Sequence, residues 1–316
     1  IDVVVVNLYA FRETVAKPGV TAADAIENID IGGPSMLRSA AKNHAAVWVV
    51  SDPADYGAVL EGLRQEGDEP QQAQALRRQL AARAFRATAA YDAAISAWFA
   101  SQEGAPLSET LTLECGAAES LRYGENPNQA ARFYRQPGVG EASIATAEQL
   151  SGKALSYNNI MDADAALELV KEFDGPAVAV IKHTNPCGCG VADDLATAFE
   201  RAWSGDPQSA FGGIVAVNRP VDLALAEAIA SPKHFLEVIV APRFDEDAVK
   251  QLQTGAKWGK NVRLLAVGEL GERDPGELAV RKVTGGYLVQ QRDLGFEGEE
   301  RRTASARAPS ETEARD

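Results

Sequence analysis

The sequence contains few cysteines and comparatively few basic residues. Its 316 residues include three cysteines, Cys115, Cys187 and Cys189. An odd and small number does not fit a disulfide framework and favours a reducing, cytoplasmic setting. Lys and Arg number 31 against 45 Asp and Glu, a formal net charge of -14. Because such a surplus repels phosphate backbones and anionic headgroups on average, neither nucleic acid nor a membrane surface is an expected partner.

Several motifs that would indicate a function class are also missing. No apolar run approaches the roughly 20 residues of a membrane span. The sequence has no Walker A motif and no G-x-G-x-x-G fingerprint after a predicted strand, so nothing supports a nucleoside-triphosphate or dinucleotide site. With 46% hydrophobic and 24% charged residues, the composition instead fits a globular protein long enough for two domains.

Segments typical of strands alternate with segments typical of helices, which predicts an α/β fold built on parallel sheets. Two domains are expected, residues 1–116 and 117–316. The expected strands are 3–6, 46–50, 177–183, 214–217, 238–240 and 262–266. The expected helices begin near Thr21, Pro34 and Asp52, cover 71–100, 162–173 and 194–203, and begin again at Ser310.

Both ends of the sequence resemble cuts within a longer chain. The first residues already form the strand 3–6, and no methionine precedes it. Near the other end, Ser310 and Glu313 form a capping-box pattern that announces a helix, yet only residues 314–316 follow. We therefore expect an internal fragment of a larger protein.

The most informative segment is the apolar strand that ends at Lys182 and His183. We expect Pro186, Gly188 and Gly190 to lead the chain out of regular structure into a loop. Because open α/β sheets place their chemistry at strand ends, the cation and the imidazole indicate a reactive site. The alternative is a buried structural histidine beside a surface lysine, but the flanking residues favour the site.

A second group of polar residues lies in the first domain. Two glycines follow Asp30 and lead into a helix, a pattern that can cradle an anion or a polar ligand. Asn7 and Tyr9 end the first strand, and Lys42 lies at the far end of the helix. These four groups could converge on a small ligand. The alternatives are a helix C-terminal cap for Asp30, packing for Tyr9 and solvated surface for Lys42.

Two further segments carry candidate binding groups. Arg122 offers a fork suited to phosphate, and Tyr123 places a hydroxyl beside it; the alternative is a domain-entry loop that its own Asn side chains cap. Gly212 and Gly213 precede a strand and would let a flat ring approach the backbone. Such glycines are also typical of a simple bulge.

A zinc site is a weak hypothesis for this sequence. Cys187 and Cys189 follow His183, but Cys-x-Cys with one upstream histidine matches structural zinc sites poorly. The His-x-Glu and Pro-Cys-x-x-Cys motifs of zinc deaminases are missing. We expect no metal and interpret both cysteines as small residues in a tight loop.

Taken together, these motifs resemble the bifunctional purine-biosynthesis family that joins phosphoribosylaminoimidazolecarboxamide (AICAR) formyltransferase to inosine monophosphate (IMP) cyclohydrolase. The matching segments follow one another along essentially the whole sequence: 7–9, 30–33, 40–44, 121–127, 182–188, 209–213 and 237–242. The resemblance implies an N-terminally truncated methylglyoxal-synthase-like domain over 1–116. It implies the first lobe of a cytidine-deaminase-like transferase domain over 117–316.

The resemblance also implies roles for individual residues. Cyclohydrolase chemistry would involve Lys42, Tyr9 and Asp30, with Asn7, Ile31 and Gly32 holding the nucleotide. In the transferase, His183 would accept the proton of the substrate amine and Lys182 would stabilise charge. The AICAR nucleotide would contact Arg122, Tyr123, Asn159, Gly212 and Glu237.

The implied function is the last two steps of de novo purine biosynthesis. A formyl group passes from the co-substrate 10-formyltetrahydrofolate to the 5-amino group of AICAR, and formyl-AICAR then closes to IMP with loss of water. The implied assembly is a homodimer, and no metal is required. Two alternatives stay open: the fragment is an inactive nucleotide-binding module, or it is a zinc hydrolase built on the Cys-x-Cys segment.

Overall fold

The structure is a computed structural model that describes residues 1–102, 107, 109–113, 115–294 and 302–315. It consists of two compact units, Ile1–Glu114 and Cys115–Asp316. The change of unit therefore falls two residues before the predicted boundary at 116. Each unit has its own buried core, and each is described separately below.

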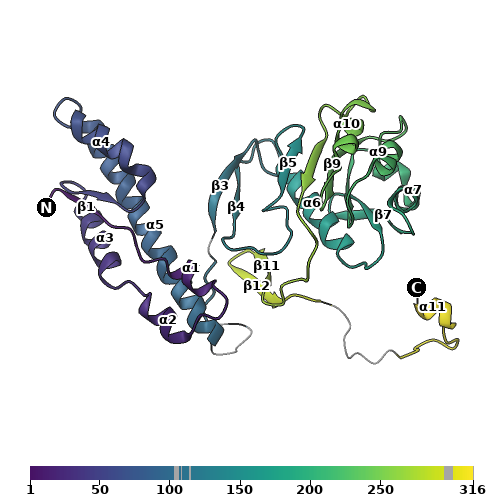
Figure 1. Ribbon diagram of the computed structural model, residues 1–316, viewed down its shortest axis with the longest axis horizontal. Coiled ribbons are helices and arrows are strands. Elements are labelled where there is room, and N and C mark those ends of the chain that lie inside the picture. The colour runs from purple at the N-terminus through teal and green to yellow at the C-terminus, as the bar shows by residue number, and fades with distance from the viewer. Residues whose placement is uncertain (103–106, 108, 114, 295–301, 316) are drawn as a thin grey trace. The chain divides into compact units, whose positions relative to one another are not determined.

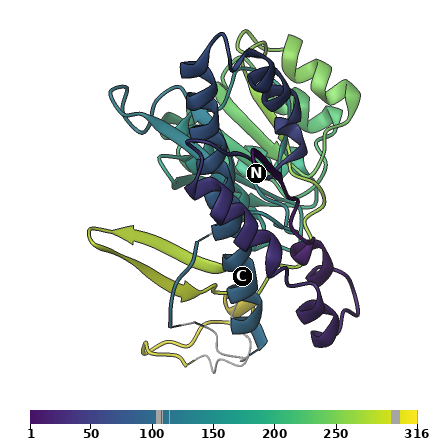
Figure 2. The same cartoon turned by 90° about the vertical axis from the view of Figure 1, so that its left-hand side faces the viewer.

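The first unit packs helices on a small parallel sheet of β1 (Val3–Val5) and β2 (Trp48–Val50), in which Val4 lies opposite Val49. Its helices are α1 (Phe11–Val15), α2 (Ala22–Glu27), α3 (Gly32–Lys42), the 3-10 turn η1 (Pro53–Asp55), α4 (Tyr56–Gln65) and α5 (Pro70–Gln102). All three β2 residues are buried, and apolar side chains of α3 and α5 pack around Trp48. Figure 2 shows α5 as one unbroken helix, as its apolar spacing predicts.

The second unit is built on a six-stranded sheet with the order β5-β10-β9-β8-β6-β7. Its strands are β5 (Glu148–Ser151), β6 (Ala177–Lys182), β7 (Asn185–Val191), β8 (Gly213–Val217), β9 (Leu236–Ala241) and β10 (Arg263–Ala266). Only β8, β9 and β10 run parallel; β6 is antiparallel to both of its neighbours, and β5 is antiparallel to β10. The fold is thus α/β with a mixed sheet, and the prediction of parallel sheets is wrong for β5, β6 and β7.

Helices cover both faces of this sheet (Figure 1). Helix α6 (Tyr157–Val170) covers the face that carries Ala179 and Ile181 of β6. On the opposite face, which carries Val178 and Val180, lie α7 (Leu195–Gly205), α9 (Leu223–Ile229) and α10 (Glu246–Thr254). Because successive strand residues point to opposite faces, a sheet covered on both sides needs a continuous apolar run, and β6 has one.

Residues 185–191 correct the sequence interpretation. They form strand β7, not the loop expected from Pro186 and the glycines. A Cβ at Gly188 would lie 2.0 Å from the carbonyl oxygen of Ala202, and one at Gly190 would lie 2.2 Å from that of Ala198. The glycines therefore allow α7 to pack directly on the strand and do not mark a turn.

Other elements refine the expected boundaries. Helix α6 begins at Tyr157, five residues before the prediction, because Ser156 and Asn159 form a capping box. The predicted helix starts at Thr21 and Ser310 are confirmed by hydrogen bonds from backbone N–H groups to these side chains, and Asp194 caps α7 in the same way. The remaining elements are β3 (Gly116–Leu121), β4 (Ala131–Arg135), α8 (Pro207–Ala210), the hairpin of β11 (Leu278–Val283) and β12 (Gly286–Gln291), and α11 (Glu311–Arg315). No helix in the described part of the chain combines the length and the apolar character needed to cross a membrane.

Candidate functional site

One edge of the six-stranded sheet gathers most of the predicted transferase residues. β6 is antiparallel to β8, and β8 is parallel to β9. The carboxyl end of β6, with Lys182 and His183, therefore lies at the same edge as Gly212 before β8 and Glu237 near the start of β9. Open α/β sheets usually bind ligands at the carboxyl ends of parallel strands. Here the candidate site lies at the amino ends of the parallel strands, because β6 runs in reverse.

His183 lies in a two-residue turn, which we call the His183–Thr184 turn, between β6 and β7. Lys182 and Asn185 are paired on either side of it. The φ angles are 54° at His183 and 59° at Thr184. Positive φ at both central residues is the signature of a type I′ turn, where Asn-Gly is the preferred sequence. Histidine is uncommon at positive φ, and a β-branched threonine is unfavourable there. The turn leaves the imidazole exposed.

Asp162, on α6, contacts this turn directly. One carboxylate oxygen accepts a hydrogen bond from the backbone N–H of His183 at 3.2 Å, and the other accepts one from that of Thr184 at 2.7 Å. The side chain of Asn185 donates to the carbonyl oxygen of His183 at 2.6 Å. The sequence interpretation named Asp162 only as a helix start. The distance of 21 residues between Asp162 and His183 left no local signal for the contact.

Lys182 points toward the segment that precedes β8. Its Nζ donates a hydrogen bond to the carbonyl oxygen of Phe211 at 2.8 Å. The next residue, Gly212, has a φ of +77° and donates its N–H to the carbonyl oxygen of Phe235 at 2.7 Å. The ammonium group is thus held at the sheet edge. This bond uses one of its three N–H donors and leaves the other two for further partners.

Asn159 and Glu237 are directly bonded. Asn159 is 5% exposed, and its amide nitrogen donates to a Glu237 carboxylate oxygen at 3.0 Å. Its amide oxygen accepts from the N–H of Ser156 at 3.1 Å, so both ends of the amide are engaged. Arg263 lies 3.6 Å from the same carboxylate. Glu237 is the partner of this pair that stays partly exposed at the sheet edge.

Arg122 and Tyr123 follow β3, and the guanidinium carbon of Arg122 lies 5.5 Å from the centre of the Tyr123 ring. The next residues form a turn closed by a 2.8 Å hydrogen bond from the N–H of Gly124 to the carbonyl oxygen of Gln129. This turn and Tyr157, the first residue of α6, line a cavity of about 580 Å³. The segment therefore lies beside the start of the helix that carries Asn159 and Asp162.

In the first unit, a cavity of about 730 Å³ is lined by five of the predicted cyclohydrolase residues: Asn7, Tyr9, Asp30, Ile31 and Gly32. Tyr9 is 59% exposed and leaves its phenol accessible. The Asp30 carboxylate accepts hydrogen bonds from the N–H groups of Tyr9 at 3.3 Å and Gly33 at 2.7 Å. Asp30 therefore caps the start of α3, and the alternative of a C-terminal cap is wrong.

The Asp30 carboxylate determines which kind of ligand the cavity of the first unit can bind. A helix N-terminus attracts anions, but Asp30 already occupies that position in α3. The cavity is therefore better suited to hydrogen-bond donors than to a phosphate. Behind it, the N–H of Asp30 donates to the hydroxyl of Tyr91 at 2.8 Å. Burial raises the pKa of Tyr91, so this phenol stays neutral and supports the position of Asp30.

Lys42 does not join the other three groups. It is the last residue of α3, ten residues after Gly32. At a rise of about 1.5 Å per residue, that places it about 15 Å along the helix axis. Lys42 is exposed and is not among the described residues that line the cavity. Asn7, Tyr9 and Asp30 thus line one cavity of this unit, Lys42 does not, and the predicted role of Lys42 stays a prediction.

The two cysteines of β7 lie in a strand, which is a correction to their interpretation as loop residues. Burial raises the pKa of both the Cys187 and Cys189 thiols, and the nearby Asp206 contributes at Cys187. Protonated thiols are poor nucleophiles and poor metal ligands. Among the described residues, no three His, Cys, Asp or Glu side chains are grouped as a metal site would require.

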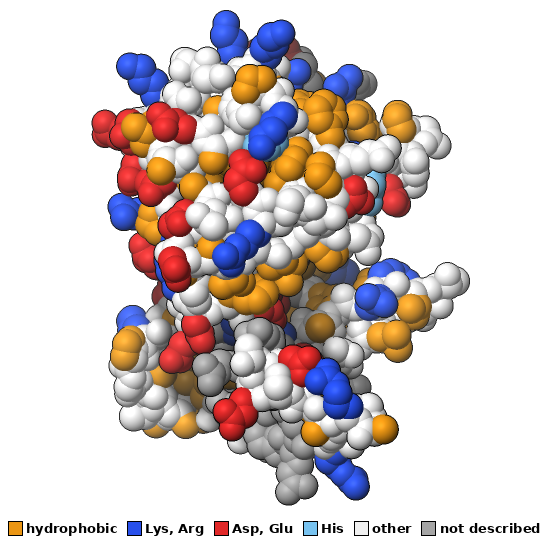
Figure 3. Space-filling view, turned by 90° about the vertical axis from the view of Figure 1, so that its right-hand side faces the viewer, with side chains coloured by type: hydrophobic (Ala, Val, Ile, Leu, Met, Phe, Trp, Pro, Cys, Tyr) orange, Lys and Arg blue, Asp and Glu red, His pale blue; other side chains and the backbone are white. Residues whose placement is uncertain are grey.

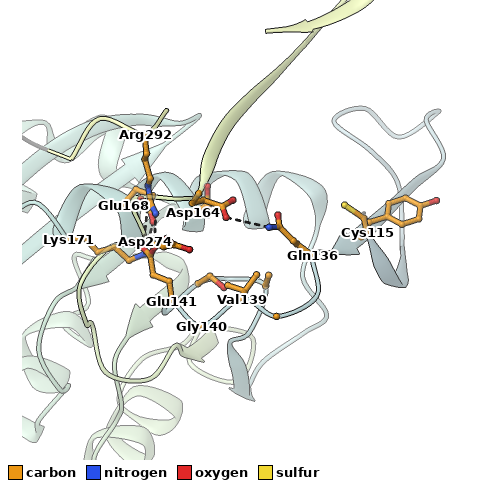
Figure 4. A pocket seen from close by; sticks show the side chains of 15 residues that line it. Cys115, Gln136, Val139, Gly140, Glu141, Asp164, Glu168, Lys171, Asp274 and Arg292 are labelled. Carbon is orange, nitrogen blue, oxygen red and sulfur yellow. Dashed lines mark hydrogen bonds and ion pairs between the residues drawn. The ribbon is translucent and has the colours of Figure 1, made fainter. Parts of the chain in front are cut away.

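A separate cavity of about 450 Å³ contains an ion-pair network (Figure 4). The Glu141 carboxylate binds Lys171 at 2.6 Å and Arg292 at 2.6 Å, and both cations also pair with Glu168. Burial would raise the pKa of Glu141, but the bonds from Arg292 and Lys171 outweigh it and lower the pKa to about 2. Because Arg292 follows β12 and Lys171 follows α6, the network ties these two parts of the unit together.

On the face drawn in Figure 3, acidic and basic side chains are interspersed with apolar ones.

Comparison with known proteins identifies the family. A model of the AICARFT/IMPCHase bienzyme matches residues 40–316. The bifunctional purine biosynthesis protein PurH of Bacillus cereus (strain AH820) is 51% identical over 317 residues, and the match covers all of this chain and 60% of that protein. The PurH protein of Bacillus mycoides (strain KBAB4) is 50% identical with the same coverage.

The sequence in a crystal structure of ForH is 42% identical, and the match covers 32% of this chain and 50% of that chain. Its TM-score is 0.27, so we draw no conclusion about the fold from it. The chain spans about 60% of the length of the curated relatives. It belongs to the AICARFT/IMPCHase bienzyme family.

Proposed function

We propose that the chain contributes to both reactions of this family. The second unit takes part in formyl transfer from 10-formyltetrahydrofolate to the 5-amino group of AICAR. The first unit takes part in the closure of formyl-AICAR to IMP with loss of water. The observation that carries the proposal is the sheet edge at which Lys182 and His183 meet Gly212 and Glu237. In this proposal residues 1–116 are a partial methylglyoxal-synthase-like domain, and 117–316 are the first lobe of a cytidine-deaminase-like domain.

His183 acts as the general base of the transfer. The amino group of AICAR is conjugated with its imidazole ring and carboxamide, so it is a weak nucleophile. A base with a pKa near neutrality accelerates such an attack by about 10²–10⁴-fold. The exposed imidazole on the His183–Thr184 turn can accept the amine proton as the nitrogen attacks the formyl carbon. The bond between the formyl carbon and the folate nitrogen then breaks, and tetrahydrofolate leaves with a proton on that nitrogen.

Lys182 stabilises the charge that develops in this step. The tetrahedral intermediate carries an oxyanion, and a fixed neighbouring cation lowers its energy. The bond to the carbonyl oxygen of Phe211 orients the Lys182 ammonium group without neutralising it. Oxyanion stabilisation is therefore available one residue away from the base.

The nucleotide is held around the same edge. Arg122 presents five donors to a phosphate, with the Tyr123 hydroxyl beside it. Glu237, oriented by Asn159, offers a carboxylate to hydroxyl or amino groups of the substrate. The positive φ of Gly212 keeps the backbone free of a side chain where the base approaches.

In the first unit, Asp30 and Tyr9 face the cyclisation substrate. The carboxamide nitrogen attacks the formyl carbon, and water leaves. An N–H₂ group is a donor, so it suits the Asp30 carboxylate at the start of α3. Asn7, Ile31 and Gly32 line the same cavity and contact the nucleotide. Lys42 lies outside this cavity, and its part in proton transfer rests on the family resemblance.

We further propose a homodimer that works in the cytoplasm and requires no metal, with AICAR, formyl-AICAR, IMP and folate as its ligands. The net charge of -14 supports the absence of nucleic acid from this set.

A pair of variants tests the division of labour in the complete protein that contains this chain. His183→Ala should abolish formyl transfer and leave the closure of supplied formyl-AICAR near its original rate. Asp30→Asn should have the reverse effect. An equal loss of both activities in either variant contradicts the proposal. Titration of AICAR into the 316-residue chain, beside turnover assays, distinguishes an inactive nucleotide-binding module.

A further inference from the structure

We infer that Asp162 is a positioning residue for His183, and that its carboxylate keeps the His183–Thr184 turn in the left-handed conformation that presents the imidazole. The catalytic consequence rests on the proposed formyl transfer. The structural claim, that Asp162 stabilises this turn, does not depend on the proposed function.

The turn needs a stabilising partner. Two successive non-glycine residues have φ angles of 54° and 59°. In this region the Cβ crowds the backbone, and β-branched residues such as threonine are the least tolerant. Strained residues persist only where their surroundings over-determine them, and they cluster at active sites. An isolated hairpin with His-Thr in place of Asn-Gly would relax.

The Asp162 carboxylate supplies that partner. Successive N–H groups in such a turn point to the same side and form a concave donor site. Each carboxylate oxygen takes one of them, at 3.2 Å from His183 N and 2.7 Å from Thr184 N. A side chain with a single acceptor oxygen cannot satisfy both donors in this way.

Asp162 is itself firmly placed. Its neighbours Ala163, Ala166 and Leu167 are fully buried against the sheet. One turn earlier on the same helix, Asn159 holds Glu237 at 3.0 Å. Residues three apart lie on the same helix face. Helix α6 therefore sets the base and the substrate-binding carboxylate from one rigid element.

Asp162→Asn provides the test, in the complete protein that contains this chain. The amide keeps one acceptor oxygen, but its NH₂ group faces a backbone N–H. The turn therefore loses one of its two hydrogen bonds to residue 162. We expect kcat for formyl transfer to fall about 10- to 100-fold. KM for AICAR should stay within about threefold, because the groups proposed to bind the nucleotide do not change. Closure of supplied formyl-AICAR should be unaffected.

A second substitution distinguishes positioning from a loss of fold. Thr184→Gly gives the turn a residue that adopts positive φ without strain. Added to Asp162→Asn, it should restore most of kcat. Asp164→Asn, two residues along the same helix and away from the turn, is the matched control and should retain wild-type kcat. An unchanged kcat in Asp162→Asn, or a loss that Thr184→Gly does not recover, overturns the inference.

Amide hydrogen exchange separates this inference from the proposed function. The N–H groups of His183 and Thr184 should exchange slowly in the wild-type protein and rapidly in Asp162→Asn. If the wild-type protein shows no formyl transfer, the proposed function fails, and this exchange measurement still decides the role of Asp162. Equal exchange in both proteins refutes it.

Discussion

Gly188→Ala should destabilise the second unit through one backbone contact. Gly188 lies in β7 where α7 crosses the strand, and an added Cβ would lie 2.0 Å from the carbonyl oxygen of Ala202. Neither partner is the end of a flexible side chain. Strand and helix must therefore separate for the methyl group to fit.

The structure sets the size of the effect. Ordinary contact begins at 3.4 Å, so a separation of more than 1 Å is required. The side chains of α7 that face the sheet, Ala198, Phe199 and Ala202, are fully buried and would lose close packing. Overpacking of this kind costs about 1–3 kcal/mol, and the gain from replacing glycine offsets less than about 1 kcal/mol of it. We expect the free energy of unfolding to fall by about 1–2 kcal/mol.

Urea denaturation, followed by hydrogen exchange of peptides from β7 and α7, measures this unit separately. Gly175→Ala is the matched control, because its added Cβ meets only Val191 Cγ1 at 3.7 Å, an ordinary contact. That variant should stay within about 1 kcal/mol of the wild type. A Gly188→Ala protein as stable as the control would show that α7 does not pack on β7 as described.

Three further changes have defined outcomes. Because the pKa of Glu141 is lowered from 4.5 to about 2, this carboxylate should contribute up to about 3 kcal/mol of stability above pH 4.5, which is lost as the pH falls toward 2. Denaturation should show about 2 kcal/mol of this loss between pH 7 and pH 3 in the wild type and little of it in Glu141→Gln, and equal pH dependence in both proteins would refute it. Gly33→Ala places a Cβ 2.4 Å from the Asp30 carboxylate, so it should lower the free energy of unfolding by about 1 kcal/mol through lost helix capping and reduce cyclisation more than formyl transfer. Gly32→Ala is the control, because its added Cβ has nothing within 4 Å, and it should unfold with the same free energy as the wild type. Metal analysis of the purified chain should find no stoichiometric zinc, and about one zinc per chain, lost when Cys187 and Cys189 are replaced by serine, would defeat that expectation.

The elements that the sequence predicted well are those determined by residues close to one another in the sequence. The apolar spacing of α5 and the side-chain caps at Thr21 and Ser310 depend on residues close together in the sequence, and the structure confirms them. The position of Lys182 and His183 at a strand end also follows from a local change, because an apolar run stops there. Such features need no knowledge of what lies across the fold.

The failures have tertiary causes. The glycines of β7 have the composition of a loop, and only the approach of α7 shows why a strand contains them. The hydrogen bond between Asp162 and His183 joins residues that are 21 positions apart, so the sequence near either residue does not predict it. The distance of Lys42 from the cavity of the first unit has, in contrast, a local cause, because the predicted helix already separates Gly32 from Lys42 by about 15 Å.

The reversed direction of β6 determines where the second unit can act. In an all-parallel sheet, the residue after a strand enters a crossover connection, and loops supply the reactive groups. Here β6 turns back directly into β7, so His183 lies on a two-residue turn that Asp162 stabilises. The adjacent parallel strands begin at this edge and contribute Gly212 and Glu237 from their amino ends. A short hairpin and one packed helix thereby position His183 with little freedom. That explains why, among the described residues, the positive φ angles outside glycine lie at His183 and Thr184.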